Sequence, residues 1–190
     1  MKRVLVGMGA VAVAAAGVLV PWNDPALSFA AQAMPVTATA EAEPIEDLIY
    51  PWCSGVPVTL RPGQGGQAGY TSSHHPVFGQ GAVQEYIEVG EDLPAGHPST
   101  AAVALHECAH ILQYRAYDYD ASELESAMER VYPEGTASGV EHMADCISEV
   151  LGAVRTGQDG RGVPYSVGYG GTCDPAQLEA SQRILAGQRA

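Results

Sequence analysis

The stretch ALHECAHILQ, residues 104–113, places two histidines four positions apart within a run of small and apolar residues. Such a run is compatible with a helix, and residues four apart lie one turn apart on one helical face. The imidazoles of His106 and His110 can therefore reach one ion, and neutral imidazole is a good zinc ligand. Glu107 is rotated by about 100° from His106, so it can reach a water on that ion without binding the ion itself. The spacing thus predicts a zinc site with Glu107 as its acid–base group.

A catalytic zinc site usually has three protein ligands, so two histidines do not complete it. The extended motif with a third histidine six residues further on is absent, because that position is Ala116. The segment GVEHMADC, residues 139–146, supplies two carboxylates four positions apart, Glu141 and Asp145. They share one face of an expected helix. One of them can bind the metal, and the other can accept the free N–H of a ligand histidine.

The pair of motifs His106-Glu107-x-x-His110 and Glu141-x-x-x-Asp145 resembles the gluzincin branch of zinc metallopeptidases. The sequence around residues 144–146 is similar to that of small bacterial neutral zinc metallopeptidases. The resemblance covers about residues 84–155. It implies that Glu141 is the third ligand and that Asp145 supports His106 or His110. It also implies a compact zincin-like α+β domain that hydrolyses peptide or protein substrates, with Glu107 as general base and then acid. The other candidates for the third ligand are Asp145, Glu125, Glu129 and His142.

The chain departs from the gluzincin pattern at the substrate site. The chain beyond the expected signal segment has no Asn, so an Asn clamp on the substrate backbone is missing. No residue maps onto the family's oxyanion-stabilising His and Tyr, and the candidates by residue type are Tyr114, Tyr165, Tyr169 and His142. Two further hypotheses therefore stand beside the peptidase: a secreted, zinc-stabilised binding domain without efficient catalysis, and a disulfide-stabilised module without metal.

The N-terminus is typical of an export signal. Lys2 and Arg3 precede an uncharged Ala-, Val- and Gly-rich run over residues 4–20, and small-residue cleavage sites follow. We expect residues 1–33 to be a signal peptide, residues 34–48 a disordered linker and residues 49–190 one domain. Because the apolar run is near the lower length limit for spanning a bilayer, an uncleaved membrane anchor is the alternative.

Charge and cysteine content agree with a location outside the cytoplasm. The formal net charge of −13 disfavours nucleic-acid binding, because an acidic surface repels phosphate. The cysteines are Cys53, Cys108, Cys146 and Cys173, an even number that predicts two disulfides in one of three connectivities. Cys108 lies some 200° from His106 around the helix, so we expect it to face the core rather than the metal.

The order of the expected elements indicates an α+β fold. Short strands are expected at residues 56–60 and 84–89, the second as an edge strand that binds substrate by β-augmentation. Helices follow at about 99–116, with Ser99 or Thr100 as cap, and at 121–131, 138–154 and 174–187. Residues 61–82 and 157–172 are expected to be loops.

Overall fold

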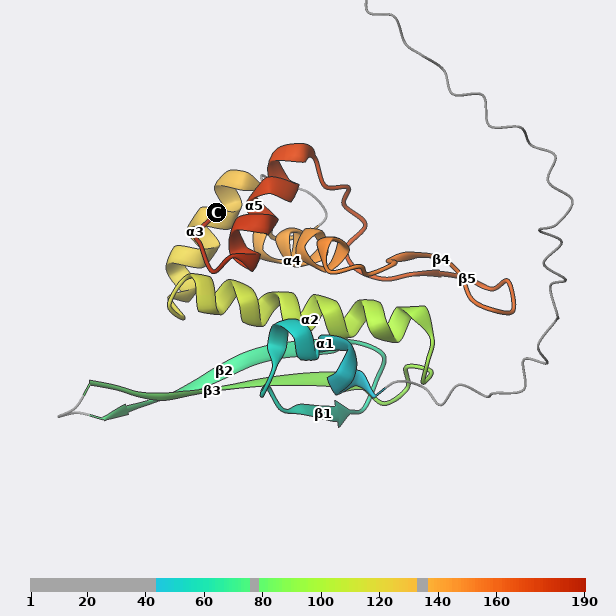
Figure 1. The fold of residues 1–190 in the computed structure, drawn as a ribbon, viewed down its shortest axis with the longest axis horizontal. Coiled ribbons are helices and arrows are strands. Elements are labelled where there is room, and N and C mark those ends of the chain that lie inside the picture. The colour runs from blue at the N-terminus through green and yellow to red at the C-terminus, as the bar shows by residue number, and fades with distance from the viewer. Residues whose placement is uncertain (1–43, 76–78, 133–136) are drawn as a thin grey trace, which may run out of the picture. The chain divides into compact units, whose positions relative to one another are not determined.

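The computed structural model describes residues 44–75, 79–132 and 137–190, and its elements confirm a mixed α+β fold (Figure 1). In chain order they are α1 (Ile45–Cys53), β1 (Val58–Arg61), β2 (Gly66–His75), β3 (Gly79–Gly90), α2 (Pro98–Ala116), α3 (Ala121–Val131), α4 (Gly139–Val150), β4 (Thr156–Gln158), β5 (Pro164–Ser166) and α5 (Pro175–Leu185). The expected signal peptide at 1–33 and the linker residues 34–43 lie outside the described residues.

A three-stranded sheet of order β1–β3–β2 forms one layer of the domain. β3 pairs in parallel with β1 and antiparallel with β2, so it is the central strand. The expectation that residues 84–89 form a substrate-binding edge strand was therefore wrong. β2 pairs with one edge of β3 along most of its length and β1 pairs with the other edge from Ile87 to Gly90, so the edge strands of the sheet are β1 and β2.

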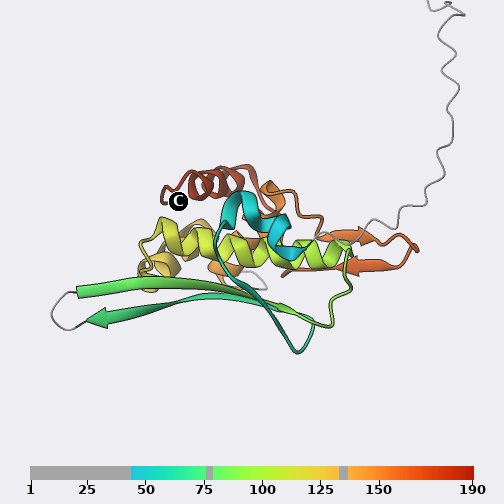
Figure 2. The ribbon, with the colours of Figure 1, turned by 60° about the horizontal axis from the view of Figure 1, so that its bottom comes forward.

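β2 runs through the Gly-rich segment that was expected to be a loop. Its sequence, GQAGYTSSHH, contains no Val or Ile, so its strand conformation depends on pairing with β3 rather than on local preference. Ile87 and Val89 of β3 are fully buried in the core that the sheet shares with α2. The long antiparallel β2–β3 pair extends beneath α2 (Figure 2).

Helix α2 lies between the sheet and the layer of α3, α4 and α5 (Figure 1). Because protein covers most of its surface, 14 of its 19 residues are buried, including His106, Glu107 and His110. Its N-cap is His97 rather than Ser99 or Thr100, because the His97 imidazole accepts a hydrogen bond from the Ser99 N–H at 3.1 Å.

The three later helices begin where the sequence predicts. α3 begins after Asp120, α4 after Ser138 and α5 after Asp174, and each of these N-cap side chains accepts a backbone N–H of its helix. The expected cap at Asp174, with Pro175 in the first turn, is confirmed. α4 ends at Val150, earlier than expected, and is followed by Leu151 and by Gly152 at φ +100°.

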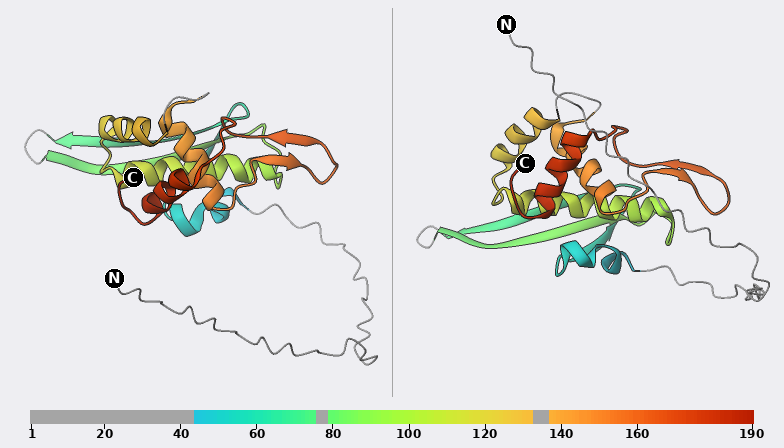
Figure 3. Two further views of the ribbon diagram at one scale, coloured as in Figure 1. Left: turned by 90° about the horizontal axis from the view of Figure 1, so that it is seen from above. Right: turned by 45° about the horizontal axis from the view of Figure 1, so that its top comes forward.

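The segment after α4 is more ordered than the expected loop. β4 and β5 form a two-stranded antiparallel hairpin that projects from the helical layer (Figure 3). The hairpin contacts the start of α2, since His97 lies 3.7 Å from an Asp159 oxygen and its ring meets Tyr165 edge-on. This contact places the hairpin and the chain that follows it beside the candidate site.

The domain begins before residue 49. Residues 45–48, expected to be part of the disordered linker, belong to α1. Glu46 and Asp47 occupy its first turn, where negative charge is favourable, and Ile49 is buried in the core. The 34–48 linker boundary was therefore wrong at its end, because burial of an apolar helix face outweighs the polar, Pro-containing composition.

All four cysteines form disulfides, Cys53–Cys108 and Cys146–Cys173. The first joins α1 to α2 and confirms that Cys108 faces the core; the second joins α4 to the segment before α5. Two disulfides are compatible with an extracellular protein. In the part of the chain that the structure describes, no helix has the length and apolar character needed to cross a bilayer.

Candidate metal centre

Helix α2 presents both motif histidines to one point. Their ring centroids are 4.8 Å apart, and each residue is buried to more than nine-tenths. His106 Nε2 lies 3.1 Å from Glu141 Oε2, and His110 Nε2 lies 3.2 Å from the same oxygen. The four-residue spacing therefore places both histidines on one face of the helix, as predicted, and both Nε2 atoms face the same carboxylate.

Glu141 reaches this point from the first turn of α4, which packs against α2. Ser138 caps the helix by accepting the Glu141 N–H, and the turn so formed directs the carboxylate toward the histidines. His106, His110 and Glu141 form a group whose potential ligand atoms lie within 4.8 Å of one another. Among the alternatives for the third ligand, Asp145 lies behind His106, and Glu125 and Glu129 line the same hollow as the group without joining it.

Each of the two histidines is held from behind by a second side chain. Asp145 Oδ1 lies 3.0 Å from His106 Nδ1, so Asp145 supports His106 rather than His110. Gln113 Oε1 lies 2.9 Å from His110 Nδ1, and the Gln113 amide donates to the Val140 carbonyl. The sequence analysis missed Gln113, although its position three residues after His110 on the helix was a usable signal. With Nδ1 engaged as donor, each Nε2 is left to act as a ligand atom.

The pKa values in the polypeptide reflect this close packing of acids and imidazoles. Burial lowers the pKa of His106, but hydrogen bonds to Asp145 and Glu141 outweigh burial and raise it to about 9. Burial raises the pKa of Glu141, but its hydrogen bonds to the two histidines hold it well below the ordinary value. Two imidazoles and a carboxylate thus meet with complementary charge, an arrangement in which a divalent cation can take the place of protons.

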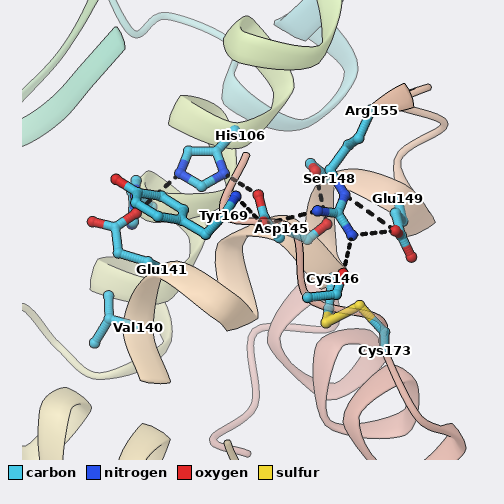
Figure 4. Close-up of polar contacts among 12 residues, drawn as sticks. His106, Val140, Glu141, Asp145, Cys146, Ser148, Glu149, Arg155, Tyr169 and Cys173 are labelled. Atoms are coloured by element: carbon cyan, nitrogen blue, oxygen red, sulfur yellow. Dashed lines mark hydrogen bonds and ion pairs between the residues drawn. A yellow bond between two sulfur atoms is a disulfide. The ribbon is translucent and has the colours of Figure 1, made fainter. Parts of the chain in front are cut away.

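Asp145 connects the candidate centre to the chain beyond α4 (Figure 4). Its carboxylate is fully buried; Oδ1 faces His106, while Oδ2 accepts from Arg155 Nη1 at 2.9 Å and from the Tyr169 N–H at 2.8 Å. Burial raises the pKa of Asp145, and the hydrogen bonds from His106 and Tyr169, with Arg155 nearby, bring it below the ordinary value. The carboxylate is therefore ionised and held by three donors.

Glu107 lies beside the ligand group and does not belong to it. It is buried, and burial raises its pKa against the opposing effect of His110 and His106. β2 passes close to it, since a Cβ added at Gly66 would lie 2.3 Å from Glu107 Oε1. A carboxylate with a raised pKa next to two metal-type ligands is suited to accept and return a proton.

Two adjoining hollows meet at the candidate centre. One, of about 590 Å³, extends over α3 and the start of α4, and the other, of about 500 Å³, extends over the segment after β5. Gly66, His106, Glu107 and Tyr169 line both. We call the pair the cleft; it gives an extended molecule access to the centre from two sides.

The four residues that were oxyanion-stabilising candidates by residue type lie in different places. Tyr169 lines both hollows, Tyr114 lines the larger one and Tyr165 the smaller. His142 instead faces the Thr172 carbonyl and the Tyr132 ring, so it is not in the cleft. Burial, Glu141 and Glu107 raise the pKa of Tyr169, and a hydrogen bond to Glu141 contributes. Tyr169 therefore keeps its proton beside the ligand group.

A second potential ligand group consists of His142, Cys146 and Cys173. Its two sulfur atoms are bonded to each other, and a disulfide lacks the thiolates that bind zinc. The group of His106, His110 and Glu141 therefore fits a metal better, because its donors are two imidazoles and one carboxylate with supported orientations. Comparison of the chain with protein-family models, with curated proteins and with solved structures finds no match in any of the three.

Proposed function

We propose that this protein is an exported, zinc-dependent peptidase of the gluzincin type, with His106, His110 and Glu141 as metal ligands. The observation that carries the proposal is the meeting of both Nε2 atoms with Glu141 Oε2, at 3.1 and 3.2 Å, next to a buried Glu107. Two imidazoles and one carboxylate are a ligand set of catalytic zinc sites. The proposal includes two further points: that the two motifs are gluzincin motifs, and that the α+β fold is zincin-like.

In this proposal Glu107 performs the proton transfers. When bound, zinc supplies a Lewis acid that polarises a peptide carbonyl and lowers the pKa of water. Glu107 accepts a proton from the attacking water and then donates it to the amine that leaves. Its raised pKa supports both steps, because an acid–base group works best when its pKa lies near the working pH.

We propose that Tyr169 donates a hydrogen bond to the carbonyl oxygen of the peptide bond under attack. Its hydroxyl is a hydrogen-bond donor next to Glu141, and its raised pKa keeps the proton in place. A donor fixed beside an oxygen that gains negative charge stabilises the transition state. Tyr114, which packs along His110, is further along the cleft and serves better as a wall of the binding site.

The substrate is proposed to bind as an extended peptide along β2. Gly66, Gln67 and Ala68 of this edge strand line the cleft, and β2 pairs only with β3 among the described strands. Backbone groups of an edge strand can hold a peptide by β-augmentation, which compensates for the missing Asn clamp. Gly66 lets the backbone come close to Glu107, so a bound peptide would pass the acid–base group.

Export is proposed from the sequence of residues 1–33, and the two disulfides are compatible with it. The chain is proposed to be released after cleavage or to stay on an N-terminal anchor. Either way the domain from Ile45 onward would work outside the cytoplasm.

Replacement of Glu107 by Gln separates a peptidase from a structural metal site. We expect the full-length protein to cleave quenched fluorescent peptides when loaded with zinc, and Glu107→Gln to lower kcat/KM by at least about 100-fold while one zinc remains bound. Elemental analysis and peptide hydrolysis would be measured on the same samples. Zinc in both proteins with no cleavage by either would instead favour a zinc-stabilised binding domain.

A further inference from the structure

We infer that Arg155 is a positioning residue for the candidate metal centre. By holding Asp145, Arg155 fixes both the orientation of His106 and the position of Tyr169. The inference rests on the proposed metal site and concerns a residue outside both sequence motifs. Arg155 touches neither the ligand group nor the cleft, and it acts only through the groups that it binds.

The Arg155 guanidinium is buried, and each of its three nitrogens donates a hydrogen bond. Its side chain is 8% exposed, and its Nη1 donates to Asp145 Oδ2 at 2.9 Å. Nη2 donates to the Gly171 carbonyl at 2.8 Å, and Nε donates to Glu149 at 3.1 Å. One rigid cation therefore joins three points of the chain: α4, the segment before α5 and the turn after α4 that carries Arg155 itself (Figure 4).

Asp145 needs this cation because its carboxylate is fully buried. A buried carboxylate without a counter-charge is strongly unfavourable, and removal of its partner leaves an uncompensated charge. Of the two oxygens, Oδ1 is used by His106 and Oδ2 by Arg155 and the Tyr169 N–H. With Oδ2 held, the plane of the carboxylate is fixed, and the direction from Oδ1 to His106 Nδ1 is fixed with it.

The segment of residues 167–173, which we call the clamp segment, closes on Asp145 from the other side. Gly168, at φ +85°, approaches so closely that an added Cβ would lie 2.4 Å from Asp145 Oδ1. Tyr169 donates its N–H to Asp145, Gly171 accepts from Arg155, and Cys173 is bonded to Cys146. A shift of Asp145 must therefore move both the ligand His106 and the clamp segment with Tyr169.

The chemistry favours Arg over Lys at this position. A planar guanidinium can donate to Asp145, Gly171 and Glu149 at once in fixed directions, whereas an ammonium group on a flexible stem acts as a single point charge. Lys is thus expected to supply the charge and to lose the geometry. This difference makes Arg155→Lys an informative variant, because a purely electrostatic role would be rescued by it.

The first test measures zinc affinity of the full-length protein by competition with a chromogenic chelator. We expect Arg155→Met to weaken zinc binding by about 10- to 100-fold, the range for loss of a group that orients a ligand, and Arg155→Lys to restore only part of it. Glu149→Gln is the matched control, since it removes the charge of another partner of Arg155 and leaves the Asp145 contact; its affinity should stay within about 3-fold of wild type. Equal zinc affinity of wild type and folded Arg155→Met would overturn the inference.

A second pair of variants keeps the test decisive if Arg155→Met fails to fold. Gly168 and Gly170 both have positive φ, +85° and +80°, so alanine strains the backbone at either position. Only at Gly168 would the new Cβ collide with Asp145; at Gly170 no atom lies within 4 Å. Gly168→Ala should weaken zinc binding about 10-fold or more and Gly170→Ala should not. Equal affinities in this pair would contradict the coupling.

The outcomes distinguish this inference from the proposed function. A wild-type protein that binds zinc and loses it in Arg155→Met, yet cleaves no peptide, would support the inference and reject the peptidase. Peptide cleavage by wild type with undiminished zinc affinity in Arg155→Met and Gly168→Ala would reject the inference alone. A wild-type protein without zinc affinity would reject both.

Discussion

At the scale of single residues, the candidate centre depends on the positions of the side-chain donor atoms and not on residue types alone. His106, His110 and Glu141 bring three donor atoms together, and Asp145 and Gln113 fix the two imidazoles from behind. Glu107 lies next to the backbone of β2, and its burial raises its pKa. Glu107 thus lies on the same helix as His106 and His110 but outside the group that they form with Glu141 of α4.

Gly66 offers a test of how closely β2 must approach Glu107. A Cβ at Gly66 would meet the end of the Glu107 side chain, so in Gly66→Ala the carboxylate must move while the fold remains. We expect peptide hydrolysis to fall by about 100-fold with little change in zinc content, because misplacing a reacting group by about 1 Å costs that much. Gly65→Ala is the control, since no atom lies within 4 Å of its added Cβ. Equal kcat/KM in the two variants would contradict the close approach.

The raised pKa of His106 predicts the pH dependence of zinc binding. The metal needs a neutral imidazole, while the acids around His106 raise its pKa from 6.5 to about 9. Zinc must therefore displace a proton at any pH below about 9, and affinity should rise by about tenfold per pH unit between pH 6.5 and 9. Chelator competition across this range would measure it. Affinity that levels off above pH 6.5 would show an unperturbed histidine.

At the scale of elements, α2 carries both histidines of the centre, and neighbouring elements cover most of this helix. The sheet lies on one side, α4 brings Glu141 on another, and α1 is tied to α2 through Cys53–Cys108. The clamp segment is tied to α4 through Cys146–Cys173. The two disulfides thus join different elements to the same helical pair, and only the second adjoins Asp145.

Removal of either disulfide should lower stability, but only removal of Cys146–Cys173 should also lower zinc affinity. By loop-closure entropy, sequence separations of 55 and 27 correspond to about 4 and about 3.5 kcal/mol of stability. Replacing Cys53 and Cys108 by Ser should lower the unfolding free energy with zinc affinity kept within about 3-fold. Replacing Cys146 and Cys173 should also weaken zinc binding, because the clamp segment is released. Denaturant unfolding and chelator competition on both double variants would check this, and equal zinc affinity in the two would be evidence against the clamp.

Local sequence signals predicted the elements whose ends carry caps. α3 and α5 begin after Asp120 and Asp174, and α4 begins after Ser138, as short-range hydrogen bonding requires. The motif helix also matches, apart from its cap at His97. These features depend on residues within one turn, so a single sequence contains the information.

Elements stabilised by distant partners were missed or misplaced. β2 lacks β-branched aliphatic residues and owes its conformation to β3, and the β4–β5 hairpin lies in a segment rich in turn residues. The place of β3 in the centre of the sheet follows from strand order, which local patterns do not encode. At the site, the roles of Gln113 and Arg155 depend on the packing of α2 against α4 and on the clamp segment. Sequence reasoning could therefore name the candidate ligands but not all of their supports.

At the scale of the whole molecule, the chain combines an acidic composition with a cross-linked domain. The formal net charge is −13, and both disulfides anchor segments that border α2 and α4. Residues from positions 64 to 169 meet around the cleft, so the candidate centre exists only in the folded domain. Zinc that binds the folded state alone would stabilise the domain by mass action.

Metal content tests the central claim most directly. Full-length protein, loaded with zinc and dialysed, would be assayed by elemental analysis beside His110→Ala, which removes one donor and leaves the helix intact. The ligand group predicts about one zinc ion per wild-type chain and less than about a tenth of that in the variant. Absence of zinc from the wild type, or equal zinc in both proteins, would contradict the account.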